Sequence, residues 1–272
     1  MMPPSPAASQ FLRKLILKGS AIVLDDQKDY LLQARLGPLI EKEGLTTWDE
    51  LVRRLTAPGT VALRQRVIEA VTTHETSFFR DWHPFEAMQA HLLPALALES
   101  RKRAIHIWSA AASSGQEIYS LAFLAAQQPG MDLGHVRFIA TDISSEILAK
   151  ARDGKYSQLE VSRGLPARLL LRYFDKLGVE YRVKDDIRRL IEFRPLNLIE
   201  AWPALPEMDV VFLRNVLIYF DVPTKRLIID RIARTMRKGG YLFLGGVEST
   251  LNLTDRFTEV HVGKTTCHQL AR

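Results

Sequence analysis

The stretch Trp108-Ser109-Ala110-Ala111-Ala112-Ser113-Ser114-Gly115-Gln116-Glu117-Ile118-Tyr119-Ser120 decides the fold of this 272-residue chain. The apolar run 105–108 that leads into it is typical of a buried strand, and residues 118–126 are typical of a helix. Between them come six consecutive Ser or Ala residues and one Gly, so a ligand can approach the backbone closely. The N–H groups of the helix start and the Glu117 carboxylate would face that ligand. An ordinary strand–helix turn of an α/β domain is the alternative interpretation.

Asp142 marks the second half of this site, one strand–helix unit further along the chain. Residues 136–141 are mostly β-branched and apolar, as in a buried strand, and 144–146 carry a helix-capping pattern. An acidic residue at the end of the second strand holds ribose hydroxyls in Rossmann-like sites. The three-glycine dinucleotide fingerprint is missing, so a nucleoside without a diphosphate, such as S-adenosylmethionine, fits better. Taken alone, an Asp at a strand end is more often just a helix cap, but its pairing with the Ser/Ala turn favours a functional role for Asp142.

The chain divides into a helical part and an α/β part near residue 90. We expect residues 1–10 to be a disordered lead-in, 11–90 a helical domain with its linker, and 91–272 the α/β domain. Strands are predicted at 105–108, 136–141, 209–213, 240–245 and 264–270, and helices at 116–127, 144–151, 166–174 and 224–237. This alternation indicates a mostly parallel sheet with helices on both faces.

The composition is that of an ordinary globular protein, with 47% hydrophobic and 25% charged residues. No apolar run approaches the roughly 20 residues of a membrane span, and we recognise no secretory signal at the N-terminus. The single cysteine, Cys267, cannot form an intrachain disulfide, which suits a reducing, cytoplasmic location. The seven histidines form no recognisable metal-ligand cluster, so no metal is expected.

Five motifs together resemble the CheR family of chemotaxis receptor methyltransferases. They are residues 72–80, 108–120, 140–143 with 151–156, 212–220, and 239–246 with Glu248-Ser249, in the family's order and spacing. The resemblance implies a class I S-adenosylmethionine-dependent methyltransferase with a Rossmann-like, mostly parallel sheet. It also implies an N-terminal all-helical domain and a small antiparallel β-insertion.

The activity implied by this resemblance is that of a protein-glutamate O-methyltransferase. Such an enzyme moves a methyl group from S-adenosylmethionine to glutamate carboxylates of methyl-accepting chemotaxis receptors, leaving glutamate 5-O-methyl esters and S-adenosylhomocysteine. A glutamate is already ionised at neutral pH, so the reaction requires no general base. Two alternatives stay open: a methyltransferase of the same fold with another signalling protein as acceptor, or a non-enzymatic cofactor-binding regulator.

Site residues follow from the resemblance, position by position. The implied cofactor contacts are His74, Thr76, Arg80, Glu117, Asp142, Asn197, Leu198, Arg214 and Asn215. Arg80 and Tyr219 are the implied catalytic residues, Arg80 by orienting charge and Tyr219 by pointing its hydroxyl toward the transferred methyl group. His74 stands where the family usually has Asn, so a pH dependence near neutrality is expected there.

A cluster of basic residues in the helical part indicates what kind of partner the protein binds. The net charge is +6, and Arg53, Arg54, Arg64 and Arg66 gather within a short span. The resemblance implies that they dock the acidic cytoplasmic helices of chemotaxis receptors, whereas the plain interpretation is a solvated helix face. Aromatic residues are not interleaved among them, which argues against single-stranded nucleic acid, and we expect no nucleic-acid partner. We expect a monomer without membrane insertion.

The segment of about 175–193 breaks the strand–helix rhythm. Two β-like runs, 179–183 and 188–193, flank Lys184-Asp185-Asp186 and suggest a small antiparallel insertion. In some family members this insertion grips a peptide at the receptor's C-terminus. The Gly-x-Gly element of those members is missing here, so no tight binding of a receptor C-terminal pentapeptide is expected.

Overall fold

A computed structural model describes residues 3–24 and 29–271. The chain forms two compact units, one containing the residues up to Thr73 with Tyr219–Lys225, and one containing His74–Ile218 with the residues from Arg226 onward. Each unit has its own hydrophobic core.

Within residues 3–24 and 29–73, the N-terminal unit contains four helices, α1 (Pro6–Ser20), α2 (Asp29–Lys42), α3 (Trp48–Thr56) and α4 (Val61–Val71). The lead-in expected over residues 1–10 is therefore wrong from Pro6 onward, while residues 1–2 lie outside the described residues. Helix α1 starts early because the Ser5 side chain accepts the N–H of Ala8 and Pro6 occupies the first turn. Thr47 and Glu50 form a reciprocal capping box at the start of α3.

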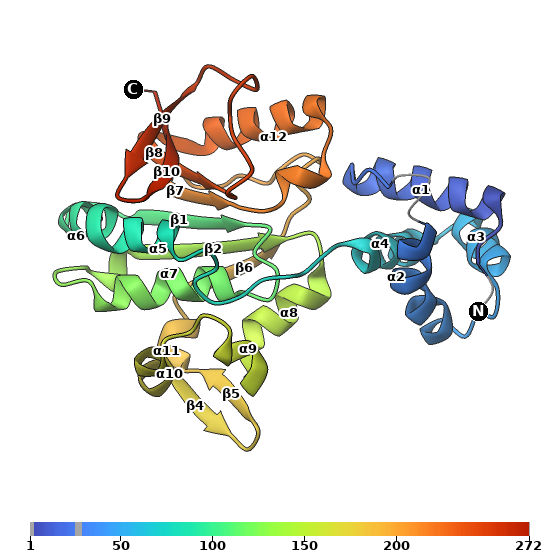
Figure 1. Ribbon diagram of the computed structural model, residues 1–272, viewed down its shortest axis with the longest axis horizontal. Coiled ribbons are helices and arrows are strands. Elements are labelled where there is room, and N and C mark those ends of the chain that lie inside the picture. The colour runs from blue at the N-terminus through green and yellow to red at the C-terminus, as the bar shows by residue number, and fades with distance from the viewer. Residues whose placement is uncertain (1–2, 25–28, 272) are drawn as a thin grey trace. The chain divides into compact units, whose positions relative to one another are not determined.

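The α/β unit is built on a seven-stranded sheet with the order β6-β2-β1-β7-β8-β10-β9 (Figure 1). Its strands are β1 (Ile105–Ala110), β2 (Val136–Asp142), β6 (Ile191–Pro195), β7 (Met208–Leu213), β8 (Met236–Leu244), β9 (Phe257–Val262) and β10 (Thr265–Leu270). The first five strands in that order pair in parallel, and β10 and β9 are antiparallel additions at one edge. The mostly parallel, Rossmann-like sheet expected from the sequence is confirmed.

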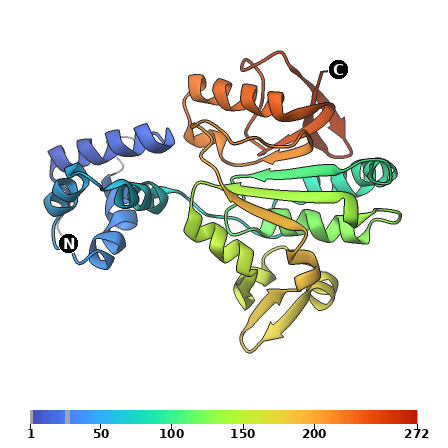
Figure 2. The ribbon, with the colours of Figure 1, turned by 180° about the vertical axis from the view of Figure 1, so that it is seen from behind.

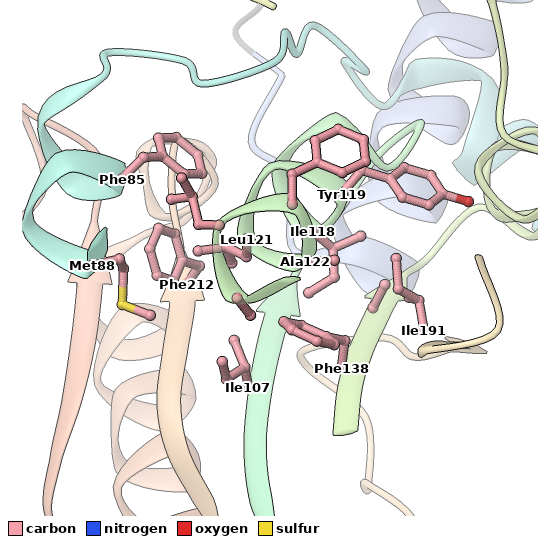
Figure 3. Packing of buried hydrophobic residues seen from close by; sticks show 14 of the residues in the cluster. Phe85, Met88, Ile107, Ile118, Tyr119, Leu121, Ala122, Phe138, Ile191 and Phe212 are labelled. Atoms are coloured by element: carbon pink, nitrogen blue, oxygen red, sulfur yellow. The ribbon is translucent and has the colours of Figure 1, made fainter. Parts of the chain in front are cut away.

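Helices cover both faces of this sheet. On one face lie α5 (His83–Ala87), the π-helix η2 (Met88–Leu92), α6 (Leu93–Ser100), α7 (Gln116–Gln127) and α8 (Ser145–Asp153). Side chains of α7, including Ile118 and Leu121, pack on Ile107, Phe138 and Phe212 of the strands (Figure 3). Helix α12 (Val222–Thr235) lies on the other side of the sheet (Figures 1 and 2).

The boundary between the units lies after Thr73 rather than near residue 90. Phe85 and Met88, which the sequence assigned to the helical domain and its linker, are buried in the core of the α/β unit (Figure 3). The Phe85 ring centroid lies 5.7 Å from that of Phe212 on β7. Helical periodicity alone could not show this, because it does not reveal which core a helix packs against.

A second, three-stranded antiparallel sheet has the order β3-β5-β4, formed by β3 (Lys155–Ser157), β5 (Glu180–Val183) and β4 (Phe174–Leu177). The short helices α9 (Gln158–Ser162), α10 (Ala167–Tyr173) and α11 (Asp185–Arg188) accompany it. The expected insertion over 175–193 is only partly correct. Residues 191–195 form strand β6, which pairs in parallel with β2 at the edge of the main sheet.

An aromatic cluster joins the small sheet to the main core. Tyr156 of β3 is fully buried, and its ring centroid lies 5.0 Å from that of Phe78. Phe78 also contacts Phe174 of β4 with centroids 5.8 Å apart, and Phe123 of α7 stacks on Tyr173 at 4.8 Å. Burial of these large rings fixes the small sheet against α7.

Candidate functional site

The candidate site lies at the carboxyl ends of β1, β2 and β7. Strand β1 pairs in parallel with β2 on one side and with β7 on the other. The chain leaves β1 toward β2 and later returns to β7 on the opposite side, so the strand order reverses at β1. Open α/β sheets bind ligands outside the carboxyl ends of the strands at such a reversal.

The turn between β1 and α7 has an unusual backbone. Ala111, Ser113 and Gly115 have φ values of 59°, 51° and 92°, in the left-handed region that favours glycine. A Cβ on Gly115 would lie 3.0 Å from the Cβ of Ala151 and 3.3 Å from the hydroxyl of Tyr156, so no other residue fits without displacing them. The Tyr156 hydroxyl donates to the carbonyl of Ser114 at 2.7 Å. The small sheet therefore supports this turn directly through β3.

Asp142 closes the turn from the end of β2. Its Oδ2 accepts the N–H of Ser113 at 2.9 Å, and its Oδ1 accepts the N–H of Ser144 at 3.0 Å. Burial raises the pKa of Asp142, while these backbone N–H groups and the nearby His74 act in the opposite direction. Ser144 caps α8, so Asp142 is not the helix cap considered as an alternative. Each carboxylate oxygen keeps a further lone pair, so ribose hydroxyls can still donate to it.

Glu117 and Arg214 form a buried ion pair. Glu117 Oε1 accepts the Ser109 hydroxyl at 2.8 Å, and Oε2 lies 3.0 Å from Nη1 of Arg214. The Arg214 side chain is only 2% exposed, and its Nη2 donates to the Asp81 carboxylate at 2.6 Å and to the carbonyl of Arg80 at 3.0 Å. Arg214 thus ties the end of β7 to the start of α7 and to the 80–81 segment. Its Nη groups are used by protein acceptors.

The 79–82 segment is held in a strained conformation. Phe79, Asp81 and Trp82 have φ values of 51°, 64° and 49°, which cost on the order of 1–2 kcal/mol each for non-glycine residues. The two bonds from Arg214 and a bond from the Phe79 N–H to the Ser120 hydroxyl at 3.1 Å hold it in place. Strain of this kind persists only where the surroundings fix it, as at binding sites.

The segment 74–80 runs past the turn as a chain without regular secondary structure before residue 78. The Ser113 hydroxyl donates to the carbonyl of His74 at 2.9 Å, so His74 lies beside the turn. His74, Thr76 and Arg80 are all half-buried. Arg80 donates from Nη1 to the carbonyl of Glu75 at 2.9 Å.

Asn197 and Leu198 lie just beyond Asp142. The N–H of Leu196 donates to the carbonyl of Asp142 at 2.9 Å, which places this segment next to β2. Asn197 Oδ1 accepts the N–H of Ile199 at 3.2 Å, and Leu198 is buried. The structure therefore brings this segment to the same edge as Asp142.

Glu248 is the site feature that the sequence analysis missed as a functional residue. Its Oε2 accepts the N–H groups of Asn215 at 2.8 Å and of Gly245 at 2.7 Å, and its Oε1 accepts the N–H of Ile218 at 3.2 Å. Asn215 has a φ of 57°. A Cβ added to Gly245 would lie 2.8 Å from the side-chain nitrogen of Asn215. One carboxylate thus joins the loops after β7 and β8. The signal was its place in the 239–249 motif.

Tyr219 and the basic cluster belong to the N-terminal unit. Tyr219 ends the 3₁₀ turn Leu217–Tyr219 and is half-buried. Among the four arginines, Arg64 donates to the carbonyl of Leu55 at 3.0 and 2.8 Å, so it caps α3. Arg54 and Arg66 both pair with Glu43, at 3.5 and 2.9 Å. Arg53 is exposed on α3, and the cluster is therefore partly neutralised within the unit.

A groove of about 470 Å³ lies elsewhere, beside the amino-terminal halves of β1 and β2, and residues such as His106, Arg137 and Arg194 line it. None of the expected site residues belongs to its lining. Among residues 3–24 and 29–271, no cluster of three or more His, Cys, Asp or Glu side chains could hold a metal ion. In the same part of the chain, no helix is both long and apolar enough to span a bilayer.

These features define the class of the protein: a Rossmann-like sheet with a tight small-residue turn after its first strand and an acid after its second is typical of a nucleoside-binding α/β protein. Comparison with known proteins specifies it. Residues 74–266 match the model of the CheR methyltransferase SAM binding domain, and residues 7–72 match that of the CheR methyltransferase all-alpha domain. The chain therefore belongs to the CheR methyltransferase family, and its cofactor is S-adenosylmethionine.

Named relatives cover nearly the whole chain. It is 42% identical over 265 residues to chemotaxis protein methyltransferase 1 of Pseudomonas aeruginosa, covering 95% of this chain and 96% of that protein. It is 39% identical to chemotaxis protein methyltransferase Cher2 of Pseudomonas putida, covering 91% and 92%. It is 34% identical to the chemotaxis protein methyltransferase of Escherichia coli, covering 93% and 88%. The family resemblance expected from the five motifs is confirmed.

Proposed function

We propose that this chain methylates glutamate side-chain carboxylates of chemoreceptors, forming glutamate 5-O-methyl esters during chemotaxis adaptation. The observation that carries this proposal is how the carboxylates of the site are used. Glu117 and Glu248 each accept hydrogen bonds from protein donors through both of their oxygens. Such carboxylates are poor general bases. An acceptor that is already ionised suits this site better than an amine or alcohol that must lose a proton.

Bound S-adenosylmethionine supplies an electrophilic methyl group on a positively charged sulfur. The protein's task is then to align the attacking carboxylate oxygen with that methyl group, with reacting atoms roughly 3–3.5 Å apart. Arg80 is suited to orient the acceptor or the cofactor carboxylate. It is half-buried, and one Nη is used on the carbonyl of Glu75, which leaves further donors. Tyr219 is kept as a proposed catalytic residue because of its place in the 212–220 motif.

The cofactor contacts are proposed by position. Asp142 would hold the ribose hydroxyls, Asn197 and Leu198 would flank the adenine, and Glu117 would sit beneath the amino-acid end with Ser109 and Arg214 behind it. Three further cofactor contacts are proposed at His74, Thr76 and Asn215. Arg214 acts by positioning Glu117 and the 79–82 segment, because its side chain is nearly inaccessible.

The partner is proposed to be the acidic cytoplasmic helix region of a chemoreceptor, bound by a monomer. Arg53 on the outer face of α3 is the most available of the four arginines, because the structure gives ion-pair or carbonyl partners to Arg54, Arg64 and Arg66. A basic helix face attracts an acidic helix and raises the rate of encounter.

The experiment that tests this function is transfer of labelled methyl from S-adenosylmethionine to receptor-containing membranes. Alkali should then release the label as methanol, because carboxyl esters are base-labile and methylated amines are not. The Asp142→Ala variant serves as the matched negative control. If the label stays on the protein after alkali treatment, the acceptor is not a carboxylate. If the receptor is not labelled at all, the proposal that chemoreceptors are the substrate is wrong.

A further inference from the structure

Strands β7 and β8 lie on the opposite side of β1 from β2, the strand that ends at Asp142. Asp142 at the end of β2 marks the ribose side of a Rossmann-like site. Glu117 contacts Arg214 at the end of β7, and Asn215, which follows Arg214, contacts Glu248 in the loop after β8. With the ribose at Asp142, the transferred methyl group would lie toward β7, and the loop after β8 would then border the approach of the acceptor.

This loop consists of two consecutive turns. The N–H of Glu248 donates to the carbonyl of Gly245 at 2.9 Å, and the N–H of Leu253 donates to that of Thr250 at 3.0 Å. Each turn carries an exposed apolar side chain, Val247 at 85% and Leu251 at 75% exposure. Tight turns favour Gly, Asn, Asp and Ser at such places, so turn formation does not explain Val or Leu.

Ile218 belongs to the same surface. Its side chain is 48% exposed, and its N–H donates to Oε1 of Glu248 at 3.2 Å. Glu248 directly follows Val247 in the chain. We call Ile218, Val247 and Leu251 the apolar rim. Neighbouring exposed apolar side chains of this kind mark contact sites for other proteins.

The charge of this loop is equally informative. Between Gly245 and Thr254 the only ionisable side chain is Glu248, and its carboxylate is directed to the three backbone N–H groups described above. The rim's own side chains therefore offer the acceptor no cation. A tight ion pair would stabilise the attacking carboxylate in the ground state and slow its reaction, whereas apolar contacts bind the surrounding segment without that effect.

We propose that the apolar rim docks the helical segment of the substrate protein that carries the acceptor glutamate, through small or apolar side chains one turn before and after it. This inference rests on the proposed function. On a helix, residues three and four positions from the glutamate share its face, so they would meet the rim when the carboxylate enters the site. The rim then contributes to acceptor binding and not to cofactor binding.

The test compares the wild type with Val247→Ser/Leu251→Ser. The KM for receptor-containing membranes should rise about tenfold, as expected from the lost burial of two apolar side chains. Its kcat and the Kd for S-adenosylmethionine should stay within about twofold of the wild type. Leu98→Ser is the matched control, because Leu98 is 63% exposed on α6, remote in sequence from the rim. Val247→Thr, which keeps the side-chain shape, should raise KM in the same direction if the double variant is unstable.

An unchanged KM in folded rim variants would overturn the docking role while leaving the proposed function intact. A cofactor Kd that weakens in parallel with KM would also overturn it, because the rim would then belong to the cofactor site. Failure of the wild type to methylate receptor at all is a separate result, which contradicts the proposed function itself.

Discussion

Replacing Glu248 by Gln tests whether one carboxylate fixes the loops after β7 and β8. The carboxylate accepts two N–H groups on Oε2, from Asn215 and Gly245, and one on Oε1, from Ile218. An amide keeps only one acceptor oxygen, and its NH₂ would face an N–H donor on the other side. The loss of one charge-assisted bond and the weakening of the others should lower the free energy of unfolding by about 1.5–3 kcal/mol.

Glu248→Ala removes all three bonds and should cost more, about 3–4 kcal/mol, because partly buried N–H groups lose their acceptor. Urea unfolding measures both changes, and calorimetry should show weaker S-adenosylmethionine binding, since Asn215 adjoins Arg214. Asp255→Asn is the matched control, a carboxylate-to-amide change at an exposed position further along the same loop. If Glu248→Gln unfolds and binds cofactor like this control, the idea that Glu248 joins the loops is refuted.

Four further predictions can each be tested separately. Asp142→Ala should weaken S-adenosylmethionine binding by on the order of 1–3 kcal/mol, and unchanged affinity by calorimetry in a folded variant would exclude a ribose contact. Reversing Arg53 and Arg54 to Glu should impair receptor methylation while preserving cofactor affinity, and the wild-type rate should fall with added salt; normal methylation by the double variant would remove this surface from docking. A receptor C-terminal pentapeptide should not bind tightly, and a low-micromolar Kd that disappears when loop 175–193 is replaced would contradict this. Burial lowers the pKa of His268, so this side chain takes up a proton when the protein unfolds, and the free energy of unfolding should decrease as pH falls below about 6.5. Urea unfolding at a series of pH values should show a weaker dependence of that free energy on pH for His268→Asn than for the wild type. The same dependence in both proteins would disprove the prediction.

The local features of the site could be predicted because they depend on neighbouring residues. The strand–turn–helix of 105–127 and the strand that ends at Asp142 agree with the structure within a few residues. A turn of Ser, Ala and Gly between an apolar run and a helix has few other solutions.

The sheet to which strand β6 belongs could not be predicted from its local sequence. Ile191 and Phe193 alternate with polar residues, a pattern that suits either an antiparallel insertion or an edge strand of the main sheet. The choice depends on pairing with β2, which comes about fifty residues earlier in the chain. No window of sequence contains that information.

By itself, the sequence determined the fold class, the cofactor turn and the family, since these depend on periodicity and on motifs whose residues are close together in the chain. Only the tertiary structure decided which charged groups neutralise one another: Arg214 with Glu117 and Asp81, Arg66 with Glu43, and Glu248 with three backbone N–H groups. Whether a charge faces a ligand or another part of the protein depends on distances of a few ångströms between segments that are remote in sequence. Those distances follow from the packing of the whole sheet and not from any single motif.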